Sequence, residues 1–185
     1  MALPKQIVLI GYRGSGKSSV GKLLAQQLEW AWCDSDDEIE AGLDVSIADV
    51  FQQQGESHFR DLETKAIRRL IDAADSQGQV ISLGGGAPMQ ERNRELWKDT
   101  ATCVYLKGSA KTLYQRTSSD ESSENRRPDL TDEGGLAEVQ KMLDLRSPTY
   151  QSCADLIVDV DDRTPSEIVQ QIVKYYSALK SSLNE

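Results

Sequence analysis

A glycine-rich loop near the start of the chain contains the residues with the clearest chemical role. Residues 11–18 read Gly-Tyr-Arg-Gly-Ser-Gly-Lys-Ser and follow an apolar run at residues 7–10. This order matches the phosphate-binding loop G-x-x-x-x-G-K-[ST], which connects a strand to a helix. Glycines let backbone N–H groups turn around a phosphate, and the N-terminus of the next helix adds a positive dipole end. We therefore predict that the phosphates of a nucleoside triphosphate bind at Gly14, Ser15, Gly16, Lys17, Ser18 and Ser19.

Two side chains at the end of this loop complete the expected phosphate site. We expect Lys17 to reach the β- and γ-phosphates and the Ser18 hydroxyl to ligate Mg²⁺. Arg13, inside the loop, has two open interpretations: it adds charge near the phosphates, or it points to solvent. The loop itself does not indicate which molecule receives a phosphate.

An acidic cluster follows the apolar run at residues 31–33. Ligands of open α/β sheets bind at the carboxyl ends of the strands, so Asp34 is expected at the same edge as the phosphate loop. Asp34 and Asp36 could divide the work, one near a metal and one near a substrate. The alternative is a helix cap, with Ser35 or Asp36 capping residues 37–41. A cap needs only one such residue, so the extra carboxylates favour a functional role.

Three further places could carry polar chemistry. Arg60 and Glu63 share a helix face, and their spacing alone favours a surface ion pair. In a cleft, Glu63 would instead orient Arg60 for a bidentate grip on a carboxylate. The three glycines at residues 84–86 offer N–H groups at the end of a strand, or form a simple turn. Arg146, taken alone, is typical of an exposed helix residue.

The segment at residues 117–135 is polar, Ser-rich and almost without apolar residues. A loop of this length in a compact domain is usually an active-site lid or is disordered. The Arg126-Arg127-Pro128 sequence in its middle favours a lid. Such a lid would keep water away from the γ-phosphate if the bound nucleotide is a phosphate donor.

Apolar runs alternate with segments of helical periodicity along the rest of the chain. Strands are expected at 6–10, 31–33, 80–83, 102–106 and 156–160. Helices are expected at 17–28, 61–74, 136–146 and 165–180, the first with Val20, Leu23, Leu24 and Leu28 on one stripe. This alternation predicts an α/β fold whose parallel sheet is covered by helices on both faces.

Composition restricts the class of protein further. The chain of 185 residues has the size of one domain, and its net charge of −9 argues against a general nucleic-acid binder. No apolar stretch is long enough to span a membrane, and the first strand begins too early to leave room for a signal peptide. Three scattered cysteines fit a reducing cytoplasm. No long exposed apolar stripe is obvious, which favours a monomer.

Taken together, these motifs resemble those of the shikimate kinase family, in the same order and along essentially the whole chain. Beyond the phosphate loop, the matching pieces are D-x-D at 34–36, F-R-x-x-E at 59–63, G-G-G at 84–86, Arg127-Pro128 and R-x-P-x-Y at 146–150. The phosphate loop occurs in many proteins, but the ordered combination is specific.

The resemblance implies a nucleoside-monophosphate-kinase-like fold with a five-stranded parallel sheet in three α/β/α layers. It implies a single kinase domain over 1–185, with a substrate-binding segment at about 34–62 and a lid at about 117–135. The implied reaction is phosphorylation of the shikimate 3-hydroxyl by ATP with Mg²⁺, in chorismate biosynthesis.

The resemblance also implies roles for individual residues. On the acceptor side, Asp36 faces the reacting hydroxyl, and Arg60, the Gly85 N–H and Arg146 bind the substrate carboxylate. On the donor side, Ser18 ligates Mg²⁺ with Asp34 near the metal, Arg127 meets the phosphates, and Arg163 lines the adenine pocket.

Departures from the family pattern concern lid movement and ATP affinity more than substrate identity, and two other functions stay open. Asp129 follows Arg127-Pro128 where the family usually has leucine, and the expected lid is long and acidic. A related kinase of the same fold could act on gluconate or a nucleotide, since gluconate also carries a carboxylate. A non-catalytic nucleotide-binding module would be expected to lack Lys17, Asp36 or the lid arginine, and all three are present.

Overall fold

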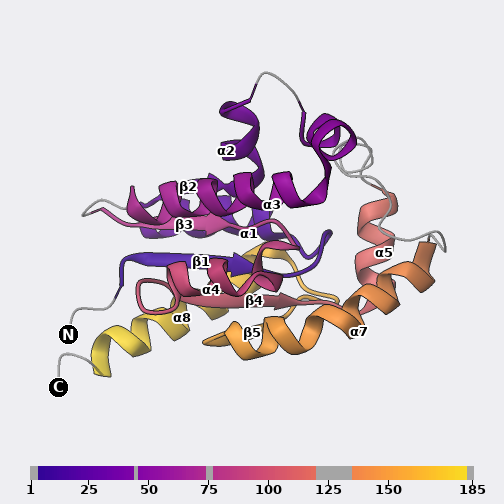
Figure 1. Ribbon diagram of the computed structural model, residues 1–185. Helices are drawn as coiled ribbons and strands as arrows, with labels where there is room; N and C mark the ends of the chain where they lie inside the picture. The colour runs from indigo at the N-terminus through magenta and orange to yellow at the C-terminus, as the bar shows by residue number, and fades with distance from the viewer. Residues whose placement is uncertain (1–3, 44–45, 74–76, 120–134, 183–185) are drawn as a thin grey trace.

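The protein is built on one five-stranded sheet, as the sequence predicts (Figure 1). The computed structural model describes residues 4–43, 46–73, 77–119 and 135–182. All strand pairs are parallel and the order is β2-β3-β1-β4-β5. The strands are β1 (Gln6–Ile10), β2 (Ala31–Asp34), β3 (Gln79–Ser82), β4 (Thr102–Lys107) and β5 (Leu156–Asp159). The central strand β1 therefore lies between β3 and β4.

Helices cover both faces of the sheet. They are α1 (Lys17–Leu28), α2 (Ser35–Ala41), α3 (Ile47–Asp72), the short η1 (Ala87–Met89), α4 (Glu91–Trp97), α5 (Ala110–Ser118), α7 (Gly135–Cys153) and α8 (Pro165–Ser182). Side chains alternate along β1: Ile7 and Leu9 pack in the core with α1 and α8, while Val8 and Ile10 pack with α3, α4 and α7. This double burial explains why the strands read as continuous apolar runs.

Several helices differ in extent from the prediction. α3 begins at Ile47 instead of residue 61, because Ser46 and Asp49 form a capping box there. Gly55 interrupts α3 with a φ of 80°, so the sequence shows no continuous helical pattern from residue 47 onward. α7 continues to Cys153 through Pro148, although proline removes one helical N–H donor. Pro148 is exposed, so the interruption lies on the solvent side.

The predicted apolar stripe of α1 is wrong at one position. Leu23 is 41% exposed, whereas Gly21 is buried beside Trp32. A Cβ on Gly21 would lie 2.5 Å from the Trp32 indole nitrogen, so only glycine allows this close contact between α1 and β2. None of the helices within the described residues could span a membrane.

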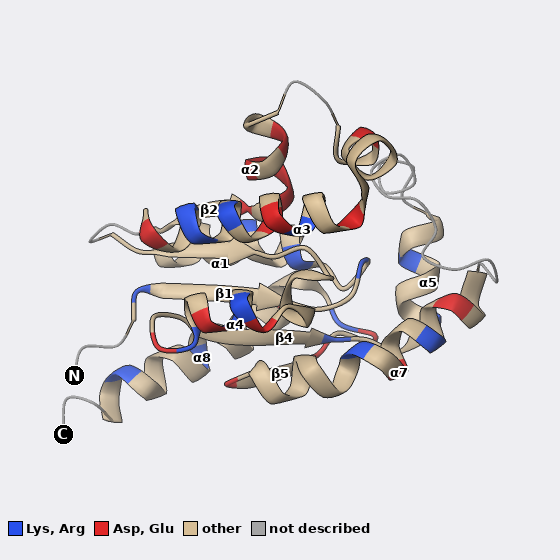
Figure 2. Ribbon diagram, viewed as in Figure 1, with Lys and Arg blue, Asp and Glu red and all other residues tan. Residues whose placement is uncertain are grey.

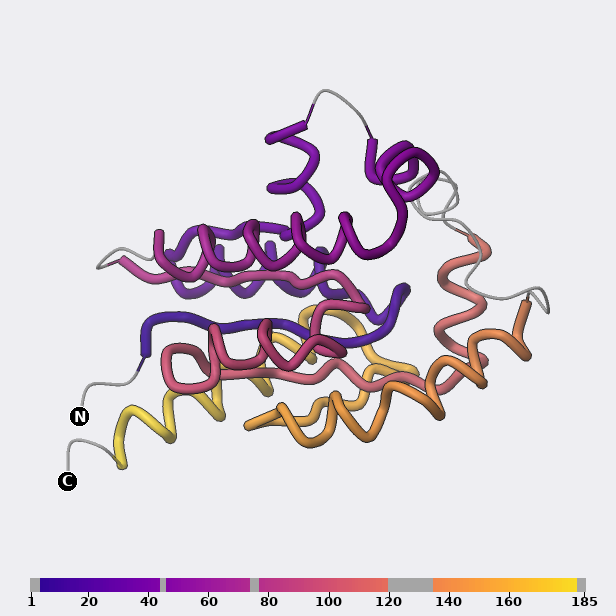
Figure 3. Tube along the Cα trace, in the orientation of Figure 1, coloured from indigo at the N-terminus to yellow at the C-terminus, as the bar shows by residue number. Residues whose placement is uncertain are grey.

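The elements beyond the carboxyl ends of the strands set the geometry of the site. The chain trace in Figure 3 shows α2 and the first turns of α3 on one side of this edge, and α5 and α7 on the other. Acidic residues mark α2 in Figure 2, where Asp36, Asp37 and Glu38 occupy the first turn. Negative charge at a helix N-terminus is favourable because it faces the positive dipole end.

Candidate active site

The phosphate loop is shaped by three glycines with positive φ angles. Gly11, Gly14 and Gly16 have φ of 146°, 77° and 88°, and Gly16 is the residue before α1. A Cβ on Gly11 would lie 2.6 Å from the Leu106 carbonyl oxygen. The loop therefore approaches β4 at a distance that a side chain would prevent, as the glycine pattern predicts.

The side chains of the loop differ in their exposure and in their hydrogen bonds. Lys17 Nζ donates to the carbonyl oxygens of Gly11 and Tyr12, each at 3.0 Å. Ser18 and Ser19 are exposed, and Ser15 is fully buried. The residues predicted to bind phosphate are thus brought together around one turn of backbone.

Asp34 connects the phosphate loop to the acidic cluster. Ser18 Oγ donates to Asp34 Oδ2 at 3.1 Å, and the Asp36 N–H donates to Asp34 Oδ1 at 2.9 Å. Burial raises the pKa of Asp34, and the negative charge of Asp36 raises it further. Asp34 caps α2, so the alternative that assigned the cap to Ser35 or Asp36 is wrong.

Ser35 has a structural role that the sequence did not indicate. Its side chain is fully buried and its Oγ accepts a hydrogen bond from the Gly84 N–H at 2.9 Å. This bond joins the start of α2 to the three-glycine turn after β3. Asp36, the next residue of α2, is half-buried.

The Arg60–Glu63 pair is buried, so the surface interpretation favoured by spacing alone is wrong. Arg60 Nη1 donates to Glu63 Oε2 at 2.9 Å, and the Glu63 side chain is fully buried. Arg60 also donates to Glu56 Oε1 at 2.9 and 3.2 Å. A Cβ on Gly86 would lie 2.5 Å from Arg60 Nη1, so the guanidinium lies directly against the glycine turn.

Two tyrosines to which the sequence assigned no role join the glycine turn and the phosphate loop to α7. Tyr150 is fully buried and donates to the Gly85 carbonyl oxygen at 2.6 Å. Burial raises the pKa of Tyr150 to about 12. Arg146 is half-buried, and its guanidinium carbon lies 5.9 Å from the centre of the Tyr12 ring. Arg146 is therefore not the exposed helix residue that its local sequence suggested.

Arg13 makes a contact that neither of its sequence interpretations included, and added charge near the phosphates stays a prediction. Its Nη2 donates to Glu138 Oε1 at 2.9 Å, and the Glu138 side chain is 1% exposed. The pair joins positions 125 residues apart, and no local pattern indicates it.

Arg127 and Arg163 are the two remaining predicted site residues. Arg127 falls outside the described residues, as does most of the expected lid. Arg163 donates to Gln171 Oε1 at 2.6 Å and to the carbonyl oxygens of Glu167 and Asp159 at 3.1 and 3.3 Å. These bonds attach Arg163 to α8 and to the end of β5, and its place at an adenine stays a prediction.

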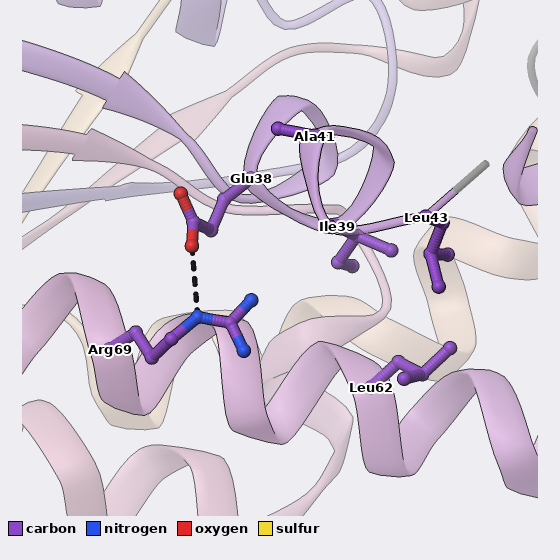
Figure 4. Close-up of a pocket in the computed structure, with 7 residues that line it drawn as sticks. Glu38, Ile39, Ala41, Leu43, Leu62 and Arg69 are labelled. Carbon is purple, nitrogen blue, oxygen red and sulfur yellow. Dashed lines mark hydrogen bonds and ion pairs between the residues drawn. The ribbon is translucent and has the colours of Figure 1, made fainter.

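A hollow of about 290 Å³ lies between α2 and α3. Figure 4 shows the Glu38–Arg69 ion pair, 2.9 Å long, on one side of it and Ile39, Leu43 and Leu62 on the other. None of the predicted site residues lines it. The Glu38–Arg69 ion pair, which is exposed, therefore connects α2 and α3 at one side of this hollow.

These features define the class of protein. A glycine loop between a buried strand and a helix, at the carboxyl edge of a parallel sheet, is the site of the P-loop phosphotransferases. The shikimate kinase family model matches residues 13–177, which is most of the chain. The chain belongs to the shikimate kinase family.

Individual relatives agree with this assignment. A shikimate kinase of Rhodopirellula baltica is 39% identical, over 92% of this chain and 90% of the relative. One of Thioalkalivibrio sulfidiphilus is 39% identical, over 95% and 89%. The structure of the Acinetobacter baumannii shikimate kinase in complex with shikimate superposes with a TM-score of 0.87, at 31% identity over 96% and 95% of the two chains. A gluconokinase of Sinorhizobium meliloti shares the fold, with a TM-score of 0.57 and 18% identity over 100% of this chain and 98% of its own.

Proposed function

We propose that the protein is a shikimate kinase that transfers the γ-phosphate of ATP to the 3-hydroxyl of shikimate. The products are shikimate 3-phosphate and ADP. Membership of the family supports this proposal. The observation that carries it is the guanidinium of Arg60, held against the glycine turn by the fully buried Glu63 beside the phosphate loop.

The acceptor half of the site suits a small hydroxylated carboxylate. Arg60, the Gly85 N–H and Arg146 provide two positive charges and a backbone donor for one carboxylate. Asp36 accepts a hydrogen bond from the reacting hydroxyl and takes its proton as the phosphate is transferred. Ser35 supports this arrangement because it joins the helix of Asp36 to the glycine turn.

The donor half holds the nucleotide. Backbone N–H groups of residues 14–19 bind the phosphates, and Lys17 neutralises charge on the β- and γ-phosphates as the bond to the leaving oxygen breaks. We assign Arg127 to the same phosphates and Arg163 to the adenine side. In phosphoryl transfer, positioning and charge neutralisation supply most of the catalysis, so Lys17, Asp36 and Arg127 are the catalytic residues.

The neighbouring oxygens of Ser18 and Asp34 fit Mg²⁺, which prefers hydroxyl, carboxylate and phosphate oxygens. Mg²⁺ supplies charge neutralisation at the phosphates when it is bound. We propose that Ser18 ligates the ion directly and that Asp34 lies near it. The raised pKa of Asp34 fits this role, because a cation would offset the burial of its charge and its repulsion by Asp36.

We propose the same domain organisation that the resemblance implies: one kinase domain over 1–185, with a substrate-binding segment at about 34–62 and a lid at about 117–135. We also propose that the protein acts as a cytoplasmic monomer on a small molecule, without a nucleic-acid or membrane partner.

A panel of acceptors in a coupled assay of ADP release tests the function. We expect turnover with shikimate and ATP in the presence of Mg²⁺, and little or none with gluconate or a nucleoside monophosphate. Lys17→Ala serves as the control for contaminating kinases. Turnover with gluconate or a nucleotide but not with shikimate would contradict the proposal.

A further inference from the structure

An ion pair with a half-exposed arginine and a buried carboxylate joins the phosphate loop to the helix that carries Arg146. Arg13 contributes its Nη2 and Glu138 its Oε1, 2.9 Å apart. We propose that Arg13 and Glu138 are positioning residues, which hold α7 against the phosphate loop so that Arg146 can reach the substrate carboxylate. The proposal rests on the proposed function, because it assigns Arg146 to the binding of shikimate.

The helix connects the ion pair directly to Arg146. Glu138 and Arg146 are eight residues apart on α7, which is about 12 Å along the axis of a helix. Between them, Val139, Met142 and Leu143 are buried in a cluster with Tyr12 of the phosphate loop. A shift of this part of α7 relative to the loop would therefore move Arg146.

Tyr12 provides a second connection. Its ring centre lies 5.7 Å from the guanidinium carbon of Arg13 and 5.9 Å from that of Arg146. Tyr12 is only 1% exposed, so its ring cannot move independently of the residues around it. One dipeptide of the phosphate loop thus contacts α7 through an ion pair and through an aromatic ring.

The ion pair strongly influences the position of α7, because the Glu138 side chain is inaccessible to water. Arg13 donates to this carboxylate at 2.9 Å, so loss of the guanidinium would take a positive charge and a hydrogen bond away from a group that water does not reach, and the helix would shift in response. The other end of α7 is fixed by the Tyr150 bond to Gly85. The shift would therefore fall on the part of the helix between Glu138 and Arg146.

The experiment compares Arg13→Met and Glu138→Gln with the wild-type protein. Shikimate binding is measured by calorimetry without nucleotide, and kcat and both KM values are measured with Mg²⁺ and ATP. We expect the Kd and KM for shikimate to rise about tenfold in each variant, and the KM for ATP to change less than about twofold, because misplacement affects the carboxylate clamp. Arg13 lies in the loop that binds ATP, so a direct effect on the nucleotide would raise the KM for ATP. A rise in the KM for shikimate alone therefore distinguishes the proposed role from that effect.

Three further variants serve as controls. Arg13→Lys keeps the charge and should recover part of the shikimate affinity. Combining Arg13→Met with Glu138→Gln should be less harmful than the sum of the two changes, since both remove the same interaction. Glu95→Gln makes the same substitution in the exposed Glu95–Lys98 pair, outside the proposed site, and should leave both KM values unchanged.

An unchanged Kd for shikimate in Arg13→Met and Glu138→Gln would overturn the proposal. Equal rises of both KM values, in step with a fall in Tm, would also overturn it, because they indicate a general loss of structure. Glu138→Gln removes the charge without changing the shape, so it decides the question if Arg13→Met does not fold. A wild-type protein that neither binds nor phosphorylates shikimate would instead refute the proposed function.

Discussion

The two halves of the candidate site are built in different ways. The phosphate loop is one continuous segment, shaped by glycines at positive φ angles. The acceptor half gathers Asp36, Arg60, Gly85 and Arg146 from α2, α3, the turn after β3 and α7. Its arginines are placed by a buried ion pair and by aromatic contacts. The donor half is thus a property of local backbone, whereas the acceptor half is a property of tertiary packing.

This difference has a consequence for mutation. A change at the phosphate-binding residues 14–19 should damage the reaction of every acceptor, because it affects the phosphate. A change in the acceptor half should affect shikimate alone and leave nucleotide binding intact. The following variants test this separation.

The largest effect is expected for Lys17→Ala. Loss of its charge removes stabilisation of the transferring phosphate, and we expect kcat/KM to fall about 10³-fold. Binding of shikimate without nucleotide, measured by calorimetry, should stay the same. A matching loss of shikimate affinity would show that the two halves are not separable.

Asp36→Asn should give the next largest effect. The amide cannot take the proton of the acceptor hydroxyl, so kcat should fall at least about 10²-fold, while ATP still binds. Steady-state kinetics and a nucleotide-binding assay measure the two quantities. A kcat close to that of wild type would exclude Asp36 as the base.

Gly86→Ala should act on the acceptor half through geometry alone. The added Cβ would lie 2.5 Å from Arg60 Nη1 and displace the guanidinium, so the KM for shikimate should rise about tenfold. The control is Gly42→Ala, where the nearest atom would lie at 3.6 Å. An equal response of the two variants would contradict the placement of Arg60.

The smallest effect is expected for Asp34→Asn, and it concerns stability. Because burial and then Asp36 raise the pKa of Asp34, its ionised form disfavours the folded state at neutral pH. Asparagine still caps α2, so Tm at pH 7 should rise by up to about 3 °C while activity falls. The gain should disappear in acid, where Asp34 is protonated in both the folded and the unfolded protein. A lower Tm at pH 7 would contradict this explanation.

The same difference explains what could be predicted from the sequence. The five strands and the phosphate loop were predicted correctly, because each depends on neighbouring residues. The burial of Glu63 was not, since an i, i+3 pair has the same spacing on a surface and in a cleft. The Arg13–Glu138 and Tyr150–Gly85 contacts join residues 125 and 65 positions apart, which no local pattern shows. The roles proposed for the acceptor residues come from the resemblance to a family, because spacing alone did not indicate them, and they stay predictions.

A crystal structure with ADP and shikimate bound tests the central claim most directly. We predict that the shikimate carboxylate lies between Arg60 and Arg146 near the Gly85 N–H. The 3-hydroxyl should lie against Asp36 and face the terminal phosphate position above Lys17. A carboxylate bound elsewhere, or a 3-hydroxyl turned away from Asp36, would contradict the account.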